Sequence, residues 1–307
     1  MRMMNVTENG GFFMTRVFNQ EEWLFVLAHD SSMSVLNKWR FFNFIKKQFN
    51  KSVDELVQRW NKTGQKKKMT SHFFLNFDIE EEKSQLDKWN IRWIDFLSPD
   101  YPEALSHIYD PPLGLFILGD ADLLNRSSLA VVGSRKATSY GKNVLTKILP
   151  DLVRKDWLIV SGLARGIDTY AHNICLEEGG ETIAVLANGL DKVYPKENRN
   201  LQIEIANKQC LVTEYPLNTA PLKGHFPMRN RIISGLSRGT LVIEAQYRSG
   251  SLITAHLALQ EGREVFAVPG HIFSENSKGT NDLIKHGAVP VLTSKDILDE
   301  LVLYSRN

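Results

Sequence analysis

The feature that most constrains the fold is a regular alternation, from residue 128 onward, of short apolar runs with helix-like segments. The apolar runs are rich in β-branched residues, which is typical of strands buried on both faces of a parallel sheet. They cover residues 129–134, 157–162, 181–188, 210–215, 240–245, 264–270 and 288–292. Between them lie segments such as GIDTYAHNICLEEG and SLITAHLALQEG, which have the length and patterning of helices. Repeated strand–helix–strand units predict a doubly wound α/β domain.

The N-terminal part of the chain has a different pattern. Apolar residues recur at helical spacing in EEWLFVLAHD and LNKWRFFNFIKKQF, and a polar stretch, NKTGQKKKMTS, follows. We therefore expect a small all-α domain over residues 1–88, and we expect the lysines of KKK to lie in a solvated loop without a functional role. Residues 89–124 contain two adjacent prolines before a short apolar run. This segment is expected to add an edge strand to a second domain over residues 89–307.

Composition narrows the possible functions. A formal net charge of +2 does not indicate a strongly basic protein, so any polyanion has to be held by a local patch. The two cysteines, Cys175 and Cys210, match no metal-ligand spacing and are too few for a disulfide framework. No apolar run reaches the length of a membrane span, and the start of the chain does not resemble a signal peptide. The expected location is the cytoplasm.

Small and polar residues follow most of the predicted strands. Ligands of open α/β sheets bind outside the carboxyl ends of the strands, so these residues are the candidates for a binding site. Three turns, GSR, SGLARG and RSGS, open helices, and backbone N–H groups at such turns can bind an anion. For any one turn, a tight connection that needs glycine explains the sequence equally well. The candidates are Gly133, Ser134, Arg135, Gly162, Arg165, Gly166, Lys196, Asn198, Ser249, Gly250 and Ser251.

Several familiar catalytic and cofactor motifs are missing. There is no G-x-G-x-x-G turn, no G-x-x-x-x-G-K-[ST] loop, no G-x-S-x-G elbow and no H-E-x-x-H helix. Asp168 and His172 lie four apart on one predicted helix, but a lone histidine there is more often part of the hydrogen-bonded structure than a catalyst. The sequence predicts no cofactor, no metal site and no catalytic residue.

The segment FPMRNRIISGLSRG places Arg229, Asn230 and Arg231 together among apolar residues. Two interpretations remain open for the arginines. They contact a bound polyanion at the rim of the sheet, or they form a structural clamp on Glu214 or Glu244.

These motifs together resemble a known family. VVGSRKATSYG, SGLARGIDTYAH, TIAVLANGLDKVYPKEN, TEYP, FPMRNRIISGLSRG, SGSLIT and VFAVPG with SKGTNDLIKHGA follow one another as in the DNA-processing protein A family, DprA or Smf. The resemblance covers residues 90–295. It implies an extended Rossmann-like fold that binds single-stranded DNA without known catalysis, forms homodimers and helps to load the RecA recombinase during natural transformation. A competence regulator is a further partner that the resemblance leaves open.

The resemblance also implies roles for individual residues. Arg135 and Lys196 match basic positions that hold the DNA backbone in the family. Further matches are Ser134, Gly162, Arg165, Gly166, Asn198, Arg229, Asn230, Arg231 and Ser249–Ser251. The implied dimer surface lies toward the C-terminal edge, around Leu283, Ile284, Val289 and Val291, although these residues suit a core equally well.

The chain departs from the family pattern in three places. Ala187, followed by Asn188, replaces a usual glycine, which puts the approach of a ligand at that turn in doubt. The N-terminal region matches only loosely, as a sterile-alpha-motif-like or helix-hairpin-like module. The sequence ends with DILDELVLYSRN, so we expect no C-terminal winged-helix domain.

The sequence therefore predicts a single-stranded-DNA-binding protein that is not an enzyme. Bases are expected to stack on Tyr194 or Phe226, with core packing as the alternative for both side chains. The rival function is an enzyme that acts on a nucleotide or nucleoside phosphate, with Glu214 or Glu244 at its reacting centre.

Overall fold

The computed structural model describes residues 2–6, 12–64 and 68–303, which fall into two compact units. The first unit contains Met1–Tyr101 with Pro112–Leu115, and the second contains Pro102–Pro111 with Phe116–Asn307. The boundary expected after residue 88 falls at the end of helix α5 (Ile79–Lys88), whereas the first division between the two units comes after Tyr101. Strand β3 (Arg92–Asp95), which follows α5, still groups with the first unit.

The main sheet has nine strands in the order β11-β10-β9-β5-β6-β7-β8-β4-β3. All the neighbours from β11 to β8 are parallel, whereas β4 runs antiparallel to β8. The strands are β4 (Gly114–Gly119), β5 (Ser128–Val132), β6 (Leu158–Ser161), β7 (Thr182–Val185), β8 (Cys210–Thr213), β9 (Gly239–Val242), β10 (Glu264–Ala267) and β11 (Val289–Pro290). This arrangement confirms the predicted doubly wound, mostly parallel sheet. The predicted strand after the two prolines is β4, but it is not the edge strand that the sequence predicts, because β3 lies beyond it at the edge of the sheet.

The order of the strands reverses next to β5. The chain adds β6, β7 and β8 on one side of β5 and then returns to add β9, β10 and β11 on the other side. The connections that leave β5 and β9 therefore diverge, and a crevice opens between them at the carboxyl ends of the strands. Crevices of this kind are the usual ligand sites of open α/β sheets.

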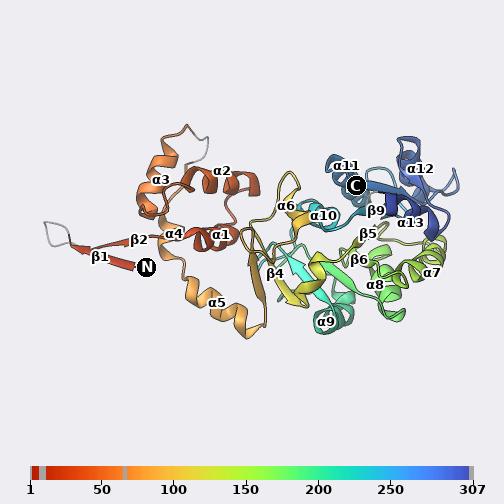
Figure 1. The fold of residues 1–307 in the computed structure, drawn as a ribbon, viewed down its shortest axis with the longest axis horizontal. Coiled ribbons are helices and arrows are strands. Elements are labelled where there is room, and N and C mark those ends of the chain that lie inside the picture. The colour runs from red at the N-terminus through yellow and green to blue at the C-terminus, as the bar shows by residue number, and fades with distance from the viewer. Residues whose placement is uncertain (1, 7–11, 65–67, 304–307) are drawn as a thin grey trace. The chain divides into compact units, whose positions relative to one another are not determined.

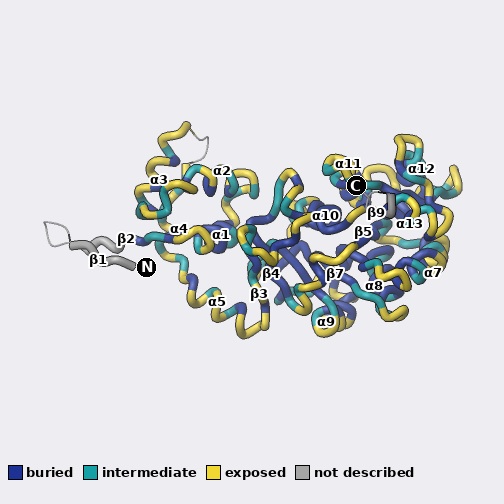
Figure 2. The backbone as a smooth tube through the Cα atoms, in the orientation of Figure 1, coloured by how far each residue is buried: buried dark blue, intermediate teal, exposed yellow. Residues whose placement is uncertain are grey.

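Helices cover both faces of this sheet, whose five central strands, β5 to β9, are buried (Figures 1 and 2). Leu129 and Val131 of β5 pack in one core with α7 and α8, and α10 lies against β5, β6 and β7 beside α11. Side chains alternate between the faces of a strand, so the two pairs of helices cover opposite faces. The helices are α6 (Glu103–Ser106), α7 (Ser139–Val153), α8 (Ile167–Glu177), α9 (Arg199–Lys208), α10 (His225–Leu236), α11 (Gly250–Gln260), α12 (Lys278–Lys285) and α13 (Ser294–Leu303).

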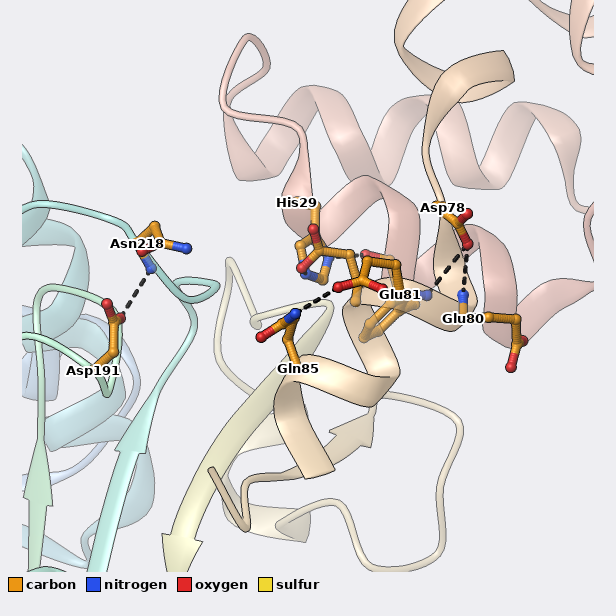
Figure 3. Close-up of polar contacts among 9 residues, drawn as sticks. His29, Asp78, Glu80, Glu81, Gln85, Asp191 and Asn218 are labelled. Carbon is orange, nitrogen blue, oxygen red and sulfur yellow. Dashed lines mark hydrogen bonds and ion pairs between the residues drawn. The ribbon is translucent and has the colours of Figure 1, made fainter. Parts of the chain in front are cut away.

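The first unit is mainly helical, as predicted. Its helices are α1 (Gln20–His29), α2 (Val35–Ile45), α3 (Val53–Asn61), α4 (His72–Asn76) and α5. Trp23 of α1 is fully buried, and its ring lies 5.5 Å from that of Phe41 and 5.4 Å from that of Phe74. Asp78 begins α5 by accepting hydrogen bonds from the backbone N–H groups of Glu80 and Glu81, both at 3.2 Å (Figure 3). An aspartate at this position satisfies N–H groups that lack helical partners.

The first unit also contains two strands near the N-terminus that the sequence pattern does not predict. Strands β1 (Arg2–Val6) and β2 (Phe12–Arg16) form an antiparallel pair ahead of α1. The N-terminal region is therefore helical with an added pair of strands. Among the described residues, no helix has the length and apolar character that crossing a membrane requires.

Both cysteines belong to the interior of the second unit. Cys175 lies in α8 and donates its thiol hydrogen to the backbone oxygen of Glu181, and Cys210 is the first residue of β8. Neither side chain has any exposed surface.

Candidate nucleic-acid-binding site

A pocket of about 680 Å³ occupies the crevice between the connections that follow β5 and β9. Gly133, Ser134 and Arg135 line it from the end of β5, and Ser249, Gly250 and Ser251 line it from the start of α11. The start of α10 closes a further side. The structure therefore brings together the GSR and RSGS turns, which are 116 residues apart at Ser134 and Gly250.

Arg135 is the best-placed cation of this pocket. Its side chain is exposed, and its guanidinium carbon lies 5.3 Å from the centre of the Phe226 ring at the start of α10. This geometry is a cation–π contact, which holds the charge at the pocket without neutralising it. Two further exposed cations line the pocket, Lys136 and Lys223, which the sequence analysis misses. Lys136 directly follows the GSR turn, so its position in the sequence was an available signal.

Two aromatic rings form one wall of the pocket. Tyr194 is 39% exposed, and its ring centre lies 5.4 Å from that of the half-buried Phe226, with the planes inclined by 53°. Both rings lie at the surface of the pocket, so packing in a core does not account for them. Aromatic faces of this kind stack on nucleic-acid bases irrespective of their sequence.

The SGLARG turn is shaped by close packing. Gly166 has φ of +79°, and a Cβ atom there would collide with the backbone oxygens of Ser134 and Arg135. A Cβ atom on Gly162 would lie 2.5 Å from the guanidinium carbon of Arg229. Close packing therefore explains why both positions are glycine. The packing at Gly166 also brings the GSR and SGLARG turns against each other.

Arg229 is buried, with 4% of its surface exposed, although it lies at the bottom of the pocket. Its guanidinium donates hydrogen bonds to the backbone oxygens of Gly162, at 2.6 Å, and Val185. It also donates from Nε to Asn230 Oδ1 at 3.1 Å, and the Asn230 amide donates to the backbone oxygen of Gly250 at 3.2 Å. Burial lowers the pKa of Arg229 to about 10, so the group keeps its charge at neutral pH. Through these bonds, Arg229 and Asn230 attach α10 to the end of β6, to the end of β7 and to the start of α11.

Arg231 forms a clamp with Glu214. The two side chains make an ion pair, and they are 7% and 8% exposed. Neither residue lines the pocket. The sequence left two interpretations open for Arg231, which are contact with a bound polyanion and a clamp on a glutamate. The structure shows the clamp, on Glu214.

The other carboxylates of the rim are also engaged. Glu244, 2% exposed, accepts hydrogen bonds from the backbone N–H group of Thr138, at 2.9 Å, and from its hydroxyl. Asp168 accepts hydrogen bonds from the backbone N–H groups of Gly162 and Ala164 at 3.2 and 3.3 Å. His172 is fully buried, and its Nδ1 lies 2.7 Å from the Thr182 hydroxyl. Nothing in these contacts links His172 to Asp168 as an acid–base pair.

Of the three remaining predicted residues, Arg165, Lys196 and Asn198, only Arg165 lines a smaller hollow beside the pocket. Arg165 lines this hollow with Arg135 and forms an exposed ion pair with Glu197. Lys196 is exposed, two residues after Tyr194, but it does not line either cavity. Asn198 is buried and donates hydrogen bonds to the Leu163 backbone oxygen and the Thr169 hydroxyl at 2.9 and 2.8 Å. Its role in the structure is to hold the SGLARG turn.

Ala187 and Asn188 also line the smaller hollow. The Asn188 amide donates hydrogen bonds to the backbone oxygens of Gly189 and Lys192 at 2.9 and 3.1 Å, so it supports its own loop. Asp191 in the same loop accepts a hydrogen bond from the backbone N–H group of Asn218 at 2.9 Å (Figure 3). Within the described part of the chain, no group of three or more histidine, cysteine or acidic residues is arranged to hold a metal ion.

A doubly wound sheet with cations and aromatic rings at its switch point defines a Rossmann-like α/β protein with a site suited to a phosphorylated ligand. The family described as DNA recombination-mediator protein A matches residues 92–302, and the chain belongs to this family. This match confirms the resemblance found in the sequence.

Relatives and solved structures agree with this assignment. The chain is 47% identical to the DNA processing protein DprA of Bacillus subtilis over 69% of this chain and 71% of that protein. It is 50% identical to that of Streptococcus pneumoniae over 73% and 79%. The crystal structure of the S. pneumoniae protein has a TM-score of 0.82 at 37% identity, covering 93% of this chain and 99% of that one. A structure of DNA processing protein A from Helicobacter pylori, described for its mode of binding single-stranded DNA, has a TM-score of 0.63 at 30% identity, covering 70% and 96%.

We predict that Asp168 makes the free energy of unfolding depend on pH. Burial raises its pKa from 3.8 to about 6, against the opposing charge of Arg229. The folded state therefore binds this proton more tightly than the unfolded state, so the stabilisation is complete below pH 4 and is lost as the pH rises through 6. Between pH 4 and pH 7, the wild type should lose up to about 3 kcal/mol relative to Asp168→Asn, which does not titrate. Urea unfolding of both proteins measures this difference, and parallel pH profiles would contradict it.

Proposed function

We propose that this protein binds single-stranded DNA without sequence preference at the pocket between β5 and β9. The observation that carries the proposal is the contact of the exposed Arg135 with Phe226, beside Tyr194, at the topological switch point. A cation beside an exposed ring and a half-buried ring that both line the pocket is suited to a strand whose phosphates and bases are both accessible. Bases in a duplex are already stacked on one another, so the pocket favours single strands.

In this proposal, exposed cations and the start of helix α11 both bind the phosphates of the strand. Arg135, Lys136 and Lys223 contact phosphates, and the beginning of α11 presents backbone N–H groups to an anion. The exposed Lys196 extends the cationic track beyond the pocket. Arg229, Asn230, Gly162, Gly166 and Asn198 act by holding the turns in place. The description of the H. pylori relative as a single-stranded-DNA-binding protein supports this function.

The enzyme alternative has less support from the site. It needs a carboxylate at a reacting centre, but Glu214 is paired with Arg231, and Glu244 is bonded to Thr138. Asp168 does line the pocket, but its carboxylate is bonded to the backbone of the SGLARG turn. We therefore propose a binding protein that acts without catalysis.

Family membership extends the proposal to the pathway of recombination. We propose that the protein protects single strands in the cytoplasm and loads the RecA recombinase onto them during natural transformation and homologous recombination. A competence regulator is a further proposed partner.

We also propose a homodimer formed through the C-terminal edge of the second unit. Of the four residues that the sequence suggests, Leu283 and Val291 are 5% and 1% exposed and belong to the interior. Ile284 and Val289 are half-buried and remain available for a contact. Dimerisation lengthens the track for one strand and raises the avidity of binding.

The first prediction from this proposal concerns DNA binding. Arg135→Glu combined with Lys196→Glu should weaken binding of a single-stranded oligonucleotide more than tenfold, because two phosphate contacts become repulsive. Fluorescence anisotropy across a salt series measures both the affinity and its salt dependence. Lys147→Glu with Lys155→Glu, which makes the same change of charge on exposed residues in and just after α7, should have little effect. Unchanged binding in a folded Arg135/Lys196 variant would refute the site.

A second prediction concerns RecA. The protein should accelerate ATP hydrolysis by RecA on single strands that are already coated with a single-strand-binding protein, since loading limits that reaction. The Arg135→Glu, Lys196→Glu variant should lose the acceleration because it no longer holds the strand. Absence of any acceleration by the wild type would reject the loading function while leaving the DNA site intact.

A third prediction concerns the dimer. Ile284→Glu should shift the protein toward monomers in analytical ultracentrifugation, because a buried charge without a partner is costly at an interface. Ile203→Glu on α9, which changes a side chain that is 47% exposed, is the matched control and should leave the association unchanged. A dimer that tolerates Ile284→Glu would place the interface elsewhere.

A further inference from the structure

The first unit has a strongly uneven distribution of charge. Residues 38–68 contain ten lysines or arginines but only two acidic residues, although the whole chain has a net charge of only +2. Acidic side chains gather instead on α5, at Asp78, Glu80 and Glu81 (Figure 3). Figure 1 shows α3 and α5 at opposite ends of this unit. Such a segment on a nearly neutral chain indicates contact with a polyanion.

Some of these cations already have partners. Lys38 is buried and donates a hydrogen bond to the Ala28 backbone oxygen at 3.2 Å. Lys51 and Arg59 both form ion pairs with Glu55. In contrast, Arg40, Lys62 and Lys68 are exposed, and none of the three forms an ion pair with any residue that the structure describes. Lys68 is the last lysine of the KKK run, for which the sequence alone predicts no role, and the other two lysines of that run lie outside the described residues.

The fold brings Arg40 and Lys68 to one pocket and places the segment that carries Lys62 next to that of Lys68. The side chain of Asn61 accepts a hydrogen bond from the Met69 backbone N–H group and donates one to the Met69 backbone oxygen, both at 2.8 Å. This pair of bonds ties residue 69 to the end of α3, so the chain segments that carry Lys62 and Lys68 lie side by side. Arg40 and Lys68 line the same pocket of about 700 Å³.

The wall of this N-terminal pocket is partly aromatic. Phe73 is half-buried and Trp60 is 5% exposed, and both line the pocket with Ser32, Asn37 and Thr70. Asp30 is the carboxylate of the lining, and it accepts a hydrogen bond from the backbone N–H group of Ser32 at 2.7 Å. Two exposed cations, Arg40 and Lys68, line the pocket against this one carboxylate, so the pocket remains suited to an anion.

We propose that Arg40, Lys62 and Lys68, the N-terminal cation cluster, form a second binding site for the phosphate backbone of single-stranded nucleic acid. A cationic mouth with an aromatic wall fits phosphates beside an unstacked base. An acidic peptide would use the charges but not the ring of Phe73. The proposal rests on the proposed function in one respect, which is the expectation that a strand bound at the pocket between β5 and β9 also binds the N-terminal cation cluster.

A second site adds affinity only for strands long enough to reach both units. Binding at one site raises the effective concentration of the rest of the strand at the other. A strand of about 10 nucleotides fills a single site, whereas one of about 60 nucleotides spans several site lengths. The contribution of the cluster is therefore separable by the length of the strand.

The test compares both lengths for the full chain and for Arg40→Gln, Lys62→Gln, Lys68→Gln. The triple variant should bind the short strand as the wild type does but the long strand about tenfold more weakly. Its slope of log affinity against log salt concentration should fall by about 2, because each phosphate that a cation neutralises on a single strand contributes roughly 0.7 to that slope. Circular dichroism checks that the variant is folded, which is expected because the three side chains are exposed.

The matched control is Lys46→Gln, Lys47→Gln, Lys88→Gln, which removes the same charge from exposed positions elsewhere in the unit. An equal loss of long-strand affinity in this control would overturn the proposal, because the total charge of the unit would then explain the binding. Polyglutamate at matched charge is added as a competitor. If it displaces the long strand from the cluster, the cluster binds acidic peptides, and the proposal is overturned. An unchanged long-strand affinity in the triple variant would refute the cluster alone, while unchanged short-strand binding in Arg135→Glu, Lys196→Glu would refute the rim pocket alone.

Discussion

The geometry of the rim depends on one buried cation, Arg229. Parallel strands end with their last backbone oxygens at the same edge of the sheet, where no further strand residue can satisfy them. The Arg229 guanidinium satisfies these oxygens at two neighbouring strands, through Gly162 and Val185. Hydrogen bonds from a charged donor are stronger than neutral ones, and a buried donor without acceptors is costly. Arg229 therefore holds the first turns of α10 against the ends of these strands, and with them Phe226 beside Arg135.

A second buried cation stabilises the same helix from the next strand. Arg231 pairs with Glu214, which directly follows β8. Because both groups are removed from water, the loss of either one leaves an uncompensated charge in the interior. Arg229 and Arg231 together attach α10 to the carboxyl ends of β6, β7 and β8. The arginine-rich segment of α10 thus serves mainly to build the binding surface, while exposed cations of other segments face the ligand.

Much of this architecture was predictable from the sequence, because it depends on local patterns. Runs of β-branched residues between helical segments indicated the seven parallel strands, and the position of the turns at strand ends located the rim. The contacts of Arg229 could not be predicted, since Val185 is 44 residues from Arg229. For Arg231 the sequence left the clamp on Glu214, 17 residues away, as one of two open interpretations, and only the structure decides between them. Tyr194 and Phe226 were also ambiguous, because a ring that packs in a core and a ring that lines a pocket have the same sequence signature. The strands β1 and β2 escaped prediction because their sequence lacks a clear alternation.

The two interior cysteines have a practical consequence for handling this molecule. Burial raises the pKa of Cys175 to about 12, and it raises the pKa of Cys210 as well. Only the thiolate reacts readily with alkylating reagents, so both groups are chemically silent while the chain is folded. A cysteine placed on the surface would then be the sole reactive thiol among the residues that the structure describes. Dyes or spin labels can be attached at chosen points without first replacing the native sulfur atoms.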